Sequence, residues 1–306
     1  MAKQLRAFIL AVIAVGVMLF LFYPNLSLLK DSTKHVEKIV SATSRAIVVQ
    51  DDGSQIFIGQ TIHQELLDEE GQAYAMVENG KIRLYARQAN ALATIYNTIR
   101  TPKGGFFDVE FPDGTQLTLN PGSTLAYTLP FDLDERRVTV DGEAYFDVAP
   151  DTARAFVVEI PKGEIRSEKA GGKLNVRNYR TDSTARIVSI DRLVTIDLIA
   201  KDSLLTLHPG EQLVSLGAVL QVNQVSVEDA IAWRNGWIVF NAMPVEEILK
   251  RLGRWYNVEV GGDSIPDFSV SGRIKANAPF NEFLAIIGAA GNLEFELHDR
   301  RLEVKR

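Results

Sequence analysis

The centre of the chain is a series of short segments in which apolar and polar residues alternate. Phe107, Val109 and Phe111 are separated by acidic residues, and the same period of two recurs up to about residue 222. A period of two places successive side chains on opposite faces of a β-strand. Glycine tolerates the positive φ of tight reversals, and it recurs between these segments, in Asp52-Gly53, Asn79-Gly80, Pro112-Asp113-Gly114, Pro121-Gly122, Asp141-Gly142 and Pro209-Gly210. We therefore expect residues 43–228 to form a mainly β domain that is curled or two-layered.

The last part of the chain, residues 233–306, contains an internal duplication. Residues 244–249 match residues 279–284, and residues 257–260 match residues 292–295, at one constant offset. Each copy starts with a proline, which suits the first turn of a helix, and continues with apolar residues at helical spacing. A strand pattern precedes and follows each helix. We expect a small α+β domain in which two β-α-β halves form one sheet, with both helices on one face.

Residues 7–29 carry no charge, and the part up to Tyr23 is almost entirely apolar. At about 1.5 Å per residue, a helix of this stretch reaches the ~30 Å thickness of a hydrocarbon core. A cleaved signal peptide is the alternative, but its apolar region is usually shorter and ends in small residues, whereas bulky residues occupy that zone here. We expect a transmembrane helix. Its Ala7, Ala11 and Ala14 form a stripe that would admit a second helix, although alanine is also common in such helices without that role.

The charges that flank this stretch predict its orientation. Lys3, Arg6 and the terminal amine precede it, whereas positive and negative residues mix after it. Because cytoplasmic flanks carry an excess of lysine and arginine, we expect residues 1–6 to be a short cytoplasmic tail. Residues 30–42 would then be a polar juxtamembrane segment with helical character, and the bulk of the chain would lie outside the cytoplasm.

Composition and motifs argue against several function classes. The chain has 33 lysines and arginines against 39 acidic residues, and its net charge of −6 offers no general attraction for nucleic acid. It has no cysteine and four widely spaced histidines, so we expect no metal site and no cofactor. No nucleophile elbow, phosphate loop or dinucleotide-binding motif occurs. We expect no catalytic residues, and we interpret Arg136-Arg137 and Arg300-Arg301 as ordinary strand-edge or turn charges.

Aromatic residues gather near the expected boundary between the two domains. The candidates for a partner interface are Trp233, Trp237, Trp255 and Tyr256. Such residues frequently anchor protein interfaces, but they are equally suited to fill the core of a small domain. The final strand, with Leu302 and Val304, would lie near a sheet edge and could pair with a strand of a partner. The basic residues that follow it could equally guard against such pairing.

Several motifs, in order along the chain, resemble the FecR family. In the β-rich part they are Ile99-Arg100-Thr101-Pro102-Lys103-Gly104-Gly105, Phe111-Pro112-Asp113-Gly114-Thr115, Arg136-Arg137-Val138 and Gly142-Glu143-Ala144-Tyr145-Phe146-Asp147-Val148. In the second domain they are Ala232-Trp233-Arg234-Asn235-Gly236, Pro244-Val245-Glu246-Glu247-Ile248-Leu249 and Arg254-Trp255-Tyr256-Asn257-Val258. The two-domain form is typical of Bacteroidetes. The second domain is similar to the small module at the N termini of secretins and TonB-dependent transporters. Gly171-Gly172 departs from the family's usual Gly-Thr pair.

The resemblance implies a non-catalytic signal transducer in the inner membrane, with a single span, a cytoplasmic N terminus and its bulk in the periplasm. Such proteins sense the signalling domain of an outer-membrane TonB-dependent transporter, and a cytoplasmic region controls an extracytoplasmic-function sigma factor. Residues 1–6 are too few to bind a sigma factor, so we expect a separate membrane protein to carry the anti-sigma region. The alternatives are a truncated chain and a periplasmic binding subunit of an envelope or transporter assembly.

Overall fold

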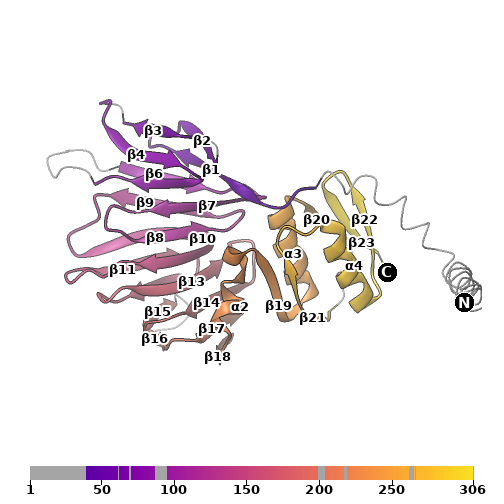
Figure 1. The fold of residues 1–306 in the computed structure, drawn as a ribbon. Helices are drawn as coiled ribbons and strands as arrows, with labels where there is room; N and C mark the ends of the chain where they lie inside the picture. Colours follow the sequence, from indigo (N-terminus) through magenta and orange to yellow (C-terminus); the bar gives the residue numbers. More distant parts are fainter. Residues whose placement is uncertain are drawn as a thin grey trace, which may run out of the picture.

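The computed structural model describes residues 39–305 except for 61, 69, 87–94, 199–203, 217–218, 262–264 and 266. The expected tail, transmembrane helix and alanine stripe lie outside the described residues, as do residues 30–38 of the juxtamembrane segment. No helix within the described part is long and apolar enough to cross a membrane. Strands dominate and helices are few, which confirms the mainly β class (Figure 1).

The β domain has two layers of strands with one apolar core between them. The first layer pairs in the order β2-β1-β6-β9-β10-β11-β12-β15-β16. The second pairs in the order β3-β4-β5-β7-β8-β10-β13-β14-β17-β18. The bounds are β1 (Thr43–Val49), β2 (Gln55–Gly59), β3 (Gln64–Leu67), β4 (Ala73–Glu78), β5 (Lys81–Leu84), β6 (Ile95–Arg100), β7 (Gly105–Glu110), β8 (Gln116–Leu119), β9 (Thr124–Leu129), β10 (Glu135–Val148), β11 (Ala155–Ile160), β12 (Gly163–Ser167), β13 (Gly172–Asn178), β14 (Thr184–Ser189), β15 (Val194–Leu198), β16 (Leu204–Leu207), β17 (Glu211–Leu216) and β18 (Val219–Gln224).

Strand β10 belongs to both layers. Its first part pairs with β9 and β11, and its second part pairs with β8 and β13. Gly142, at the change of layer, has a φ of 136°, and a Cβ atom there would lie 2.6 Å from the Cα of Ser123. The predicted turn at Asp141-Gly142 is therefore wrong. The glycine permits a close approach inside a continuous strand rather than a reversal.

A short connection leads from the β domain to the C-terminal domain. Helix α2 (Val227–Ala230) and the 3₁₀ turn η3 (Ala232–Asn235) follow β18. The remaining elements are β19 (Trp237–Pro244), α3 (Val245–Tyr256), β20 (Glu259–Gly261), β21 (Ser269–Lys275), α4 (Phe280–Gly291), β22 (Glu294–His298) and β23 (Arg301–Lys305). Their buried apolar side chains form a second core, separate from that of the β domain.

The strands of the C-terminal domain form two sheets rather than the single sheet that we expected. Strand β19 pairs with β21, and β23 lies between β20 and β22. Helix α3 contacts β19 and β20, and α4 contacts β21 and β22, so each helix touches both sheets. The physical reason is that equivalent strands of the two copies lie in the same sheet. The strands before the two helices, β19 and β21, pair with each other, whereas the strands after them, β20 and β22, both pair with β23. Apolar side chains from both sheets and both helices then share one core.

The two helices begin and end alike, as the duplication predicts. Pro244 and Pro279 are the N-cap residues, one position before the first turn where we expected them. Asn257 and Asn292 both adopt the left-handed conformation at the C-terminal end, with φ of 53° and 50°. Both helices thus begin after a proline and end at an asparagine in the left-handed conformation.

The N-terminal segment of the described chain passes over the C-terminal domain before it enters β1 (Figure 1). Residues 39–42 are not helical, so the expected helical character does not hold there. Ile39 and Ala42 are buried in the core of the C-terminal domain, although they lie about two hundred positions away from it in sequence. This segment therefore joins the second domain to the first strand of the β domain.

Candidate functional site

Charged side chains of helix α3 hold the C-terminal domain against the β domain. The two Nη atoms of Arg254 donate hydrogen bonds of 3.0 and 2.8 Å to the two carboxylate oxygens of Asp182. The same guanidinium lies 3.8 Å above the ring of Tyr179. A bidentate pair of this kind fixes orientation as well as distance. Both partners are nearly buried, so loss of Arg254 would leave the Asp182 carboxylate with only the longer, 3.6 Å ion pair to Arg177 inside the junction.

A second ionic contact lies two helical turns away. Glu247 accepts hydrogen bonds of 3.1 and 2.8 Å from Arg186, and an Nη atom of Arg177 lies 3.1 Å from it. Burial raises the pKa of the Glu247 carboxyl, but the hydrogen bond from Arg186 and the charge of Arg177 outweigh this effect and hold the pKa below its ordinary value. The carboxylate is engaged by two arginines and therefore acts as a fixed anchor between the domains.

A buried chain of polar side chains runs from the connection into the β domain. The indole N–H of Trp233 donates to Asn175 at 3.2 Å. Asn175 donates to Glu143 at 3.2 Å, and Asn120 donates to the other oxygen of the same carboxylate at 2.6 Å. Because all four side chains in this hydrogen-bonded series are buried, displacing Trp233 would leave buried polar groups without partners.

Backbone contacts tie the N-terminal segment to the same junction. The N–H of Gly104 donates to the carbonyl of Arg254 at 2.7 Å, and the carbonyl of Gly104 accepts from the N–H of Thr43 at 3.0 Å. Gly104 has a φ of 70°, a conformation that favours glycine. The end of α3, the turn before β7 and the start of β1 are thus connected through one glycine.

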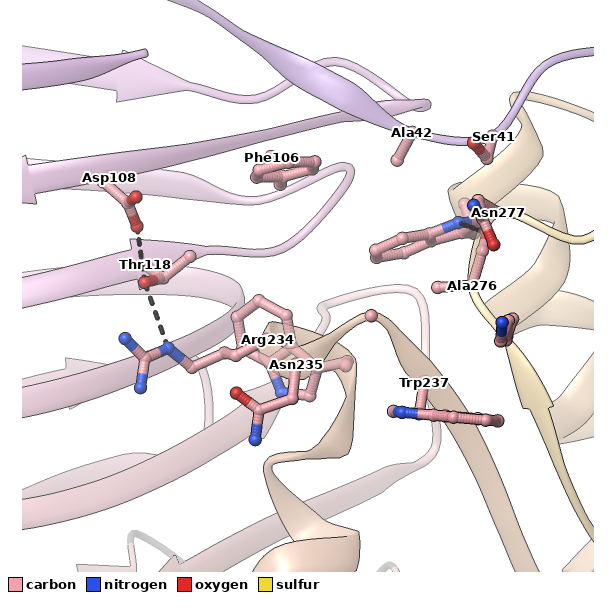
Figure 2. A pocket seen from close by; sticks show the side chains of 14 residues that line it. Ser41, Ala42, Phe106, Asp108, Thr118, Arg234, Asn235, Trp237, Ala276 and Asn277 are labelled. Carbon is pink, nitrogen blue, oxygen red and sulfur yellow. Dashed lines mark hydrogen bonds between the residues drawn. The ribbon is translucent and has the colours of Figure 1, made fainter. Parts of the chain in front are cut away.

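A cavity of about 490 Å³ opens where these parts meet (Figure 2). Its walls come from β7 and β8, from the η3 turn, from the strands and loop of the C-terminal domain, and from Ser41 and Ala42. Arg234 lies over the ring of Tyr145 at 3.7 Å and donates to the hydroxyl of Thr118 at 3.3 Å, and that hydroxyl donates to Asp108 at 2.6 Å. The junction therefore combines ionic anchors with a polar and aromatic hollow.

Two family models match this chain. The model described as FecR protein matches residues 97–189, and the model described as FecR, C-terminal matches residues 237–304. Together they span just over half of the sequence. The chain belongs to the FecR family.

Two crystal structures resemble the FecR fold of this chain. Both are described as a "putative anti-sigma factor" from Parabacteroides distasonis ATCC 8503, at 1.65 and 2.50 Å resolution. Each has 25% sequence identity and a TM-score of 0.64, and each alignment covers 68% of this chain and 98% of the other. No curated protein sequence matches the chain.

The structure brings two of the FecR motifs, which are separate in sequence, into direct contact. Arg136 is fully buried and donates to Asp113 at 2.7 Å. Asp113, in the turn before β8, also accepts from the N–H and the hydroxyl of Thr115, each at 2.9 Å. Our interpretation of Arg136 as an ordinary strand-edge or turn charge is therefore wrong. A cation this deep in the FecR domain needs a carboxylate partner, and the Pro112-Asp113-Gly114 turn supplies it.

The structure buries most of the aromatic residues that the sequence singled out. Trp233, Trp255 and Tyr256 are 3%, 7% and 1% exposed. Their burial favours the core interpretation for these three side chains. Trp237 is half-buried at the cavity, where an interface role stays a prediction.

The final strand of the FecR C-terminal domain is not at a sheet edge. Strand β23, which contains Leu302 and Val304, lies between β20 and β22. Leu302 is fully buried, and Val304 packs partly buried against the same core. Our expectation that this strand could accept a partner strand is wrong, because both of its edges already carry backbone hydrogen bonds.

Sequence reasoning missed the ionic anchors of the FecR junction. Glu247, Arg251 and Arg254 are spaced by four and three positions, which places them on one side of a helix. That charged stripe was the available signal. It did not reveal the partners, because Arg186 and Asp182 lie 61 and 72 positions away from their helix partners in sequence.

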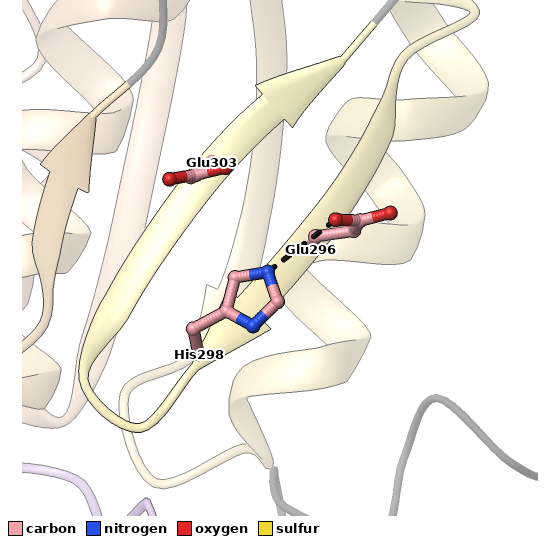
Figure 3. A group of neighbouring side chains, drawn as sticks. All are labelled: Glu296, His298 and Glu303. Atoms are coloured by element: carbon pink, nitrogen blue, oxygen red, sulfur yellow. Dashed lines mark hydrogen bonds and ion pairs between the residues drawn. The ribbon is translucent and has the colours of Figure 1, made fainter.

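One group of side chains on β22 and β23 has metal-ligand character (Figure 3). Ligand atoms of Glu296, His298 and Glu303 lie within 4.8 Å of one another. The group is largely exposed, and Lys305 already forms an ion pair of 2.5 Å with Glu296. These contacts account for the cluster as a surface ion-pair network.

Proposed function

We propose that this FecR protein regulates a sigma factor as a non-catalytic signal transducer. The observation that carries the proposal is the pair of FecR matches, one on each domain of the chain. The likeness to crystal structures described as a "putative anti-sigma factor" supports it, because those alignments cover 98% of the other chain. In this proposal the protein acts by contact with other proteins.

The junction supports a transducer in which both domains act as one unit. Two ionic anchors, a buried polar chain and the Gly104 backbone contacts connect them. The N-terminal segment packs into the core of the C-terminal domain through Ile39 and Ala42. A partner that shifts the C-terminal domain would therefore also disturb the segment that leads toward the N terminus.

The finer parts of the proposal concern location and partners. We place the folded part in the periplasm, anchored in the inner membrane by a helix over residues 7–29, because that stretch is uncharged and long enough to span. The partner on the outer side would be the signalling domain of a TonB-dependent transporter. A second membrane protein would carry the region that binds the sigma factor.

A transcription experiment tests the regulatory role. The gene is deleted, and the strain is complemented with the wild-type chain, with Arg254→Asp or with Lys250→Gln. Arg254→Asp places two carboxylates against each other in the junction and should fail to restore the transcript pattern. Lys250 lies on the exposed side of α3, where it pairs with Glu246, so Lys250→Gln should restore the pattern and serves as the matched control.

The same strains distinguish the proposal from a purely structural role. Transcripts that stay unchanged on deletion, while transporter assembly or uptake fails, would contradict the regulatory function. Purification of the tagged full chain from membranes should recover a sigma factor or a second membrane protein. Alkaline phosphatase fused to the C terminus should be active if the bulk of the chain lies outside the cytoplasm, and inactive fusions would overturn that location.

A further inference from the structure

The cavity at the junction is bordered by every tryptophan of the chain. Trp233, Trp237 and Trp255 all line it. Phe106 stacks on Trp255 with the ring centres 6.3 Å apart and the planes within 8°. Its volume of about 490 Å³ lies in the range of about 300–1,000 Å³ that is usual for ligand pockets. The cavity thus offers aromatic surface in a hollow large enough for a side chain or a small ligand.

The tryptophans differ in their hydrogen bonds. The indole N–H groups of Trp233 and Trp255 donate to Asn175 and to the carbonyl of Ala276. The indole N–H of Trp237 has no acceptor among the described residues. Trp237 is also only half-buried, with the guanidinium of Arg273 at 4.7 Å from its ring. Two of the rings are therefore fixed by hydrogen bonds, whereas no described residue fixes the indole N–H of Trp237.

The charges around the cavity are mainly positive, although the chain as a whole has a net charge of −6. Lys275 lines the cavity and has no ion-pair partner in the described part of the chain. Arg234 and Arg273 add two cations, held over aromatic rings. Asp108 is the acidic residue of the lining, and its carboxylate accepts from Thr118. This balance favours a ligand that carries negative charge.

The rim also offers free amide groups. Asn235 and Asn277 are exposed, and neither side-chain amide has a hydrogen-bond partner among the described residues (Figure 2). A side-chain amide provides both a donor and an acceptor, which match the two groups of a peptide unit. Aromatic walls, cations without an ion-pair partner in the described part of the chain, and the rim amides together suit a peptide better than a simple anion.

We propose that this cavity binds an acidic peptide segment of a protein partner and takes up an aromatic side chain of that segment. The ring lies against Trp237 and Trp255, the flanking carboxylates face Lys275 and Arg273, and the rim amides bond the peptide backbone. The proposal rests on the proposed function only in taking the ligand to be a protein. Because Ser41 forms part of the wall, an occupied cavity touches the N-terminal segment as well as both domains.

Intrinsic fluorescence of the purified full chain in detergent tests this site, because all three tryptophans border it. The probe is the peptide acetyl-Glu-Asp-Phe-Asp-Glu-amide, which contains no tryptophan. It should change the emission in a saturable manner. The same peptide with alanine in place of phenylalanine, and a version with lysine in place of the acidic residues, should bind more weakly.

Variants connect the signal to the cavity. Lys275→Gln should weaken binding about fivefold, which is the upper range for an exposed charge pair. Lys250→Gln removes a lysine outside the cavity and should leave binding unchanged. Equal binding of the acidic and basic peptides, or an unchanged affinity in Lys275→Gln, would overturn the proposal. Tighter saturation by free 3-phenylpropionate than by the peptide would overturn the peptide as ligand. None of these results depends on transcription, so the sigma-factor role can fail independently.

Discussion

Helices α3 and α4 have similar ends and a similar buried stripe, but their surface residues differ. Both begin after a proline and end at a left-handed asparagine, and both bury four equivalent apolar positions, although α3 also buries Trp255 and Tyr256 in its last turn. The outward positions Glu247 and Arg254 of α3 bind the β domain, whereas Glu282 and Ala289, their equivalents in α4, are exposed. The two copies thus share their helix ends and part of their core, but only α3 carries the charged residues that bind the β domain.

The largest loss of stability is expected from substitutions at the core positions, and it should be similar for the two helices. Phe283 and its equivalent Ile248 are both buried in the shared core, and Phe283 contacts the rings of Phe240 and Tyr256. Phe283→Ala should cost about 3–5 kcal/mol and Ile248→Ala about 2–5 kcal/mol in the free energy of unfolding. Urea denaturation followed by circular dichroism measures both. A copy that tolerates its substitution without loss would show that the two copies do not share one core.

Substitutions at the outward positions of the two helices should have different effects on stability. Arg254→Ala leaves the nearly buried Asp182 without its bidentate partner and should cost about 3 kcal/mol. Ala289→Arg places the same side chain at the equivalent exposed position of α4 and should change stability by less than about 0.5 kcal/mol. Thermal unfolding of the two variants checks this difference. Equal losses would mean that α4 is also docked on a surface.

The acid dependence of the junction should come partly from Glu247. Its pKa in the folded protein lies below the ordinary value of 4.5, so its contribution to stability is present above that pH and is lost as the pH falls through the folded pKa. The effect is expected to be smaller than the loss of Arg254, because a protonated carboxyl still accepts hydrogen bonds. Denaturation of the wild type and of Glu247→Gln should show a stability difference at pH 7 that shrinks below about pH 4.5. A difference that stays constant with pH would refute this assignment.

The smallest effects are expected at the helix ends, where the copies should again agree. Asn257→Ala and Asn292→Ala should each cost about 1 kcal/mol, because alanine adopts the left-handed conformation poorly. Glycine in place of either asparagine should retain stability. Paired denaturation curves measure the four variants. A large loss for only one alanine variant would indicate that tertiary contacts, rather than the shared backbone conformation, decide that helix end.

Several features of the fold followed from local patterns. The period of two and the glycine turns predicted a mainly β domain, and the offset between residues 244–249 and 279–284 predicted the paired helices. The errors occurred where distant chain segments meet. Gly142 looked like a turn residue but sits inside β10, and Arg136 looked like an ordinary surface charge but is buried against Asp113.

The candidate site was harder to predict than the fold. The sequence located its aromatic residues near the boundary of the two domains, because tryptophans cluster there. It gave no means to decide which of them would be buried. Trp233 is buried, and its indole N–H donates to Asn175, 58 positions earlier, a pairing that exists only after β13 and the η3 turn are brought together.

The sequence by itself determined that the first domain is mainly β and that the second has two similar helices, because strand alternation, helix stripes and end residues act over a few neighbouring positions. The tertiary structure alone decided which strands share a sheet, that β23 is central and that Ile39 is buried in the far domain. It also decided that Glu247 and Arg254 find partners 61 and 72 positions away. These outcomes depend on burial and on distant charges, and no local pattern in a single sequence specifies them.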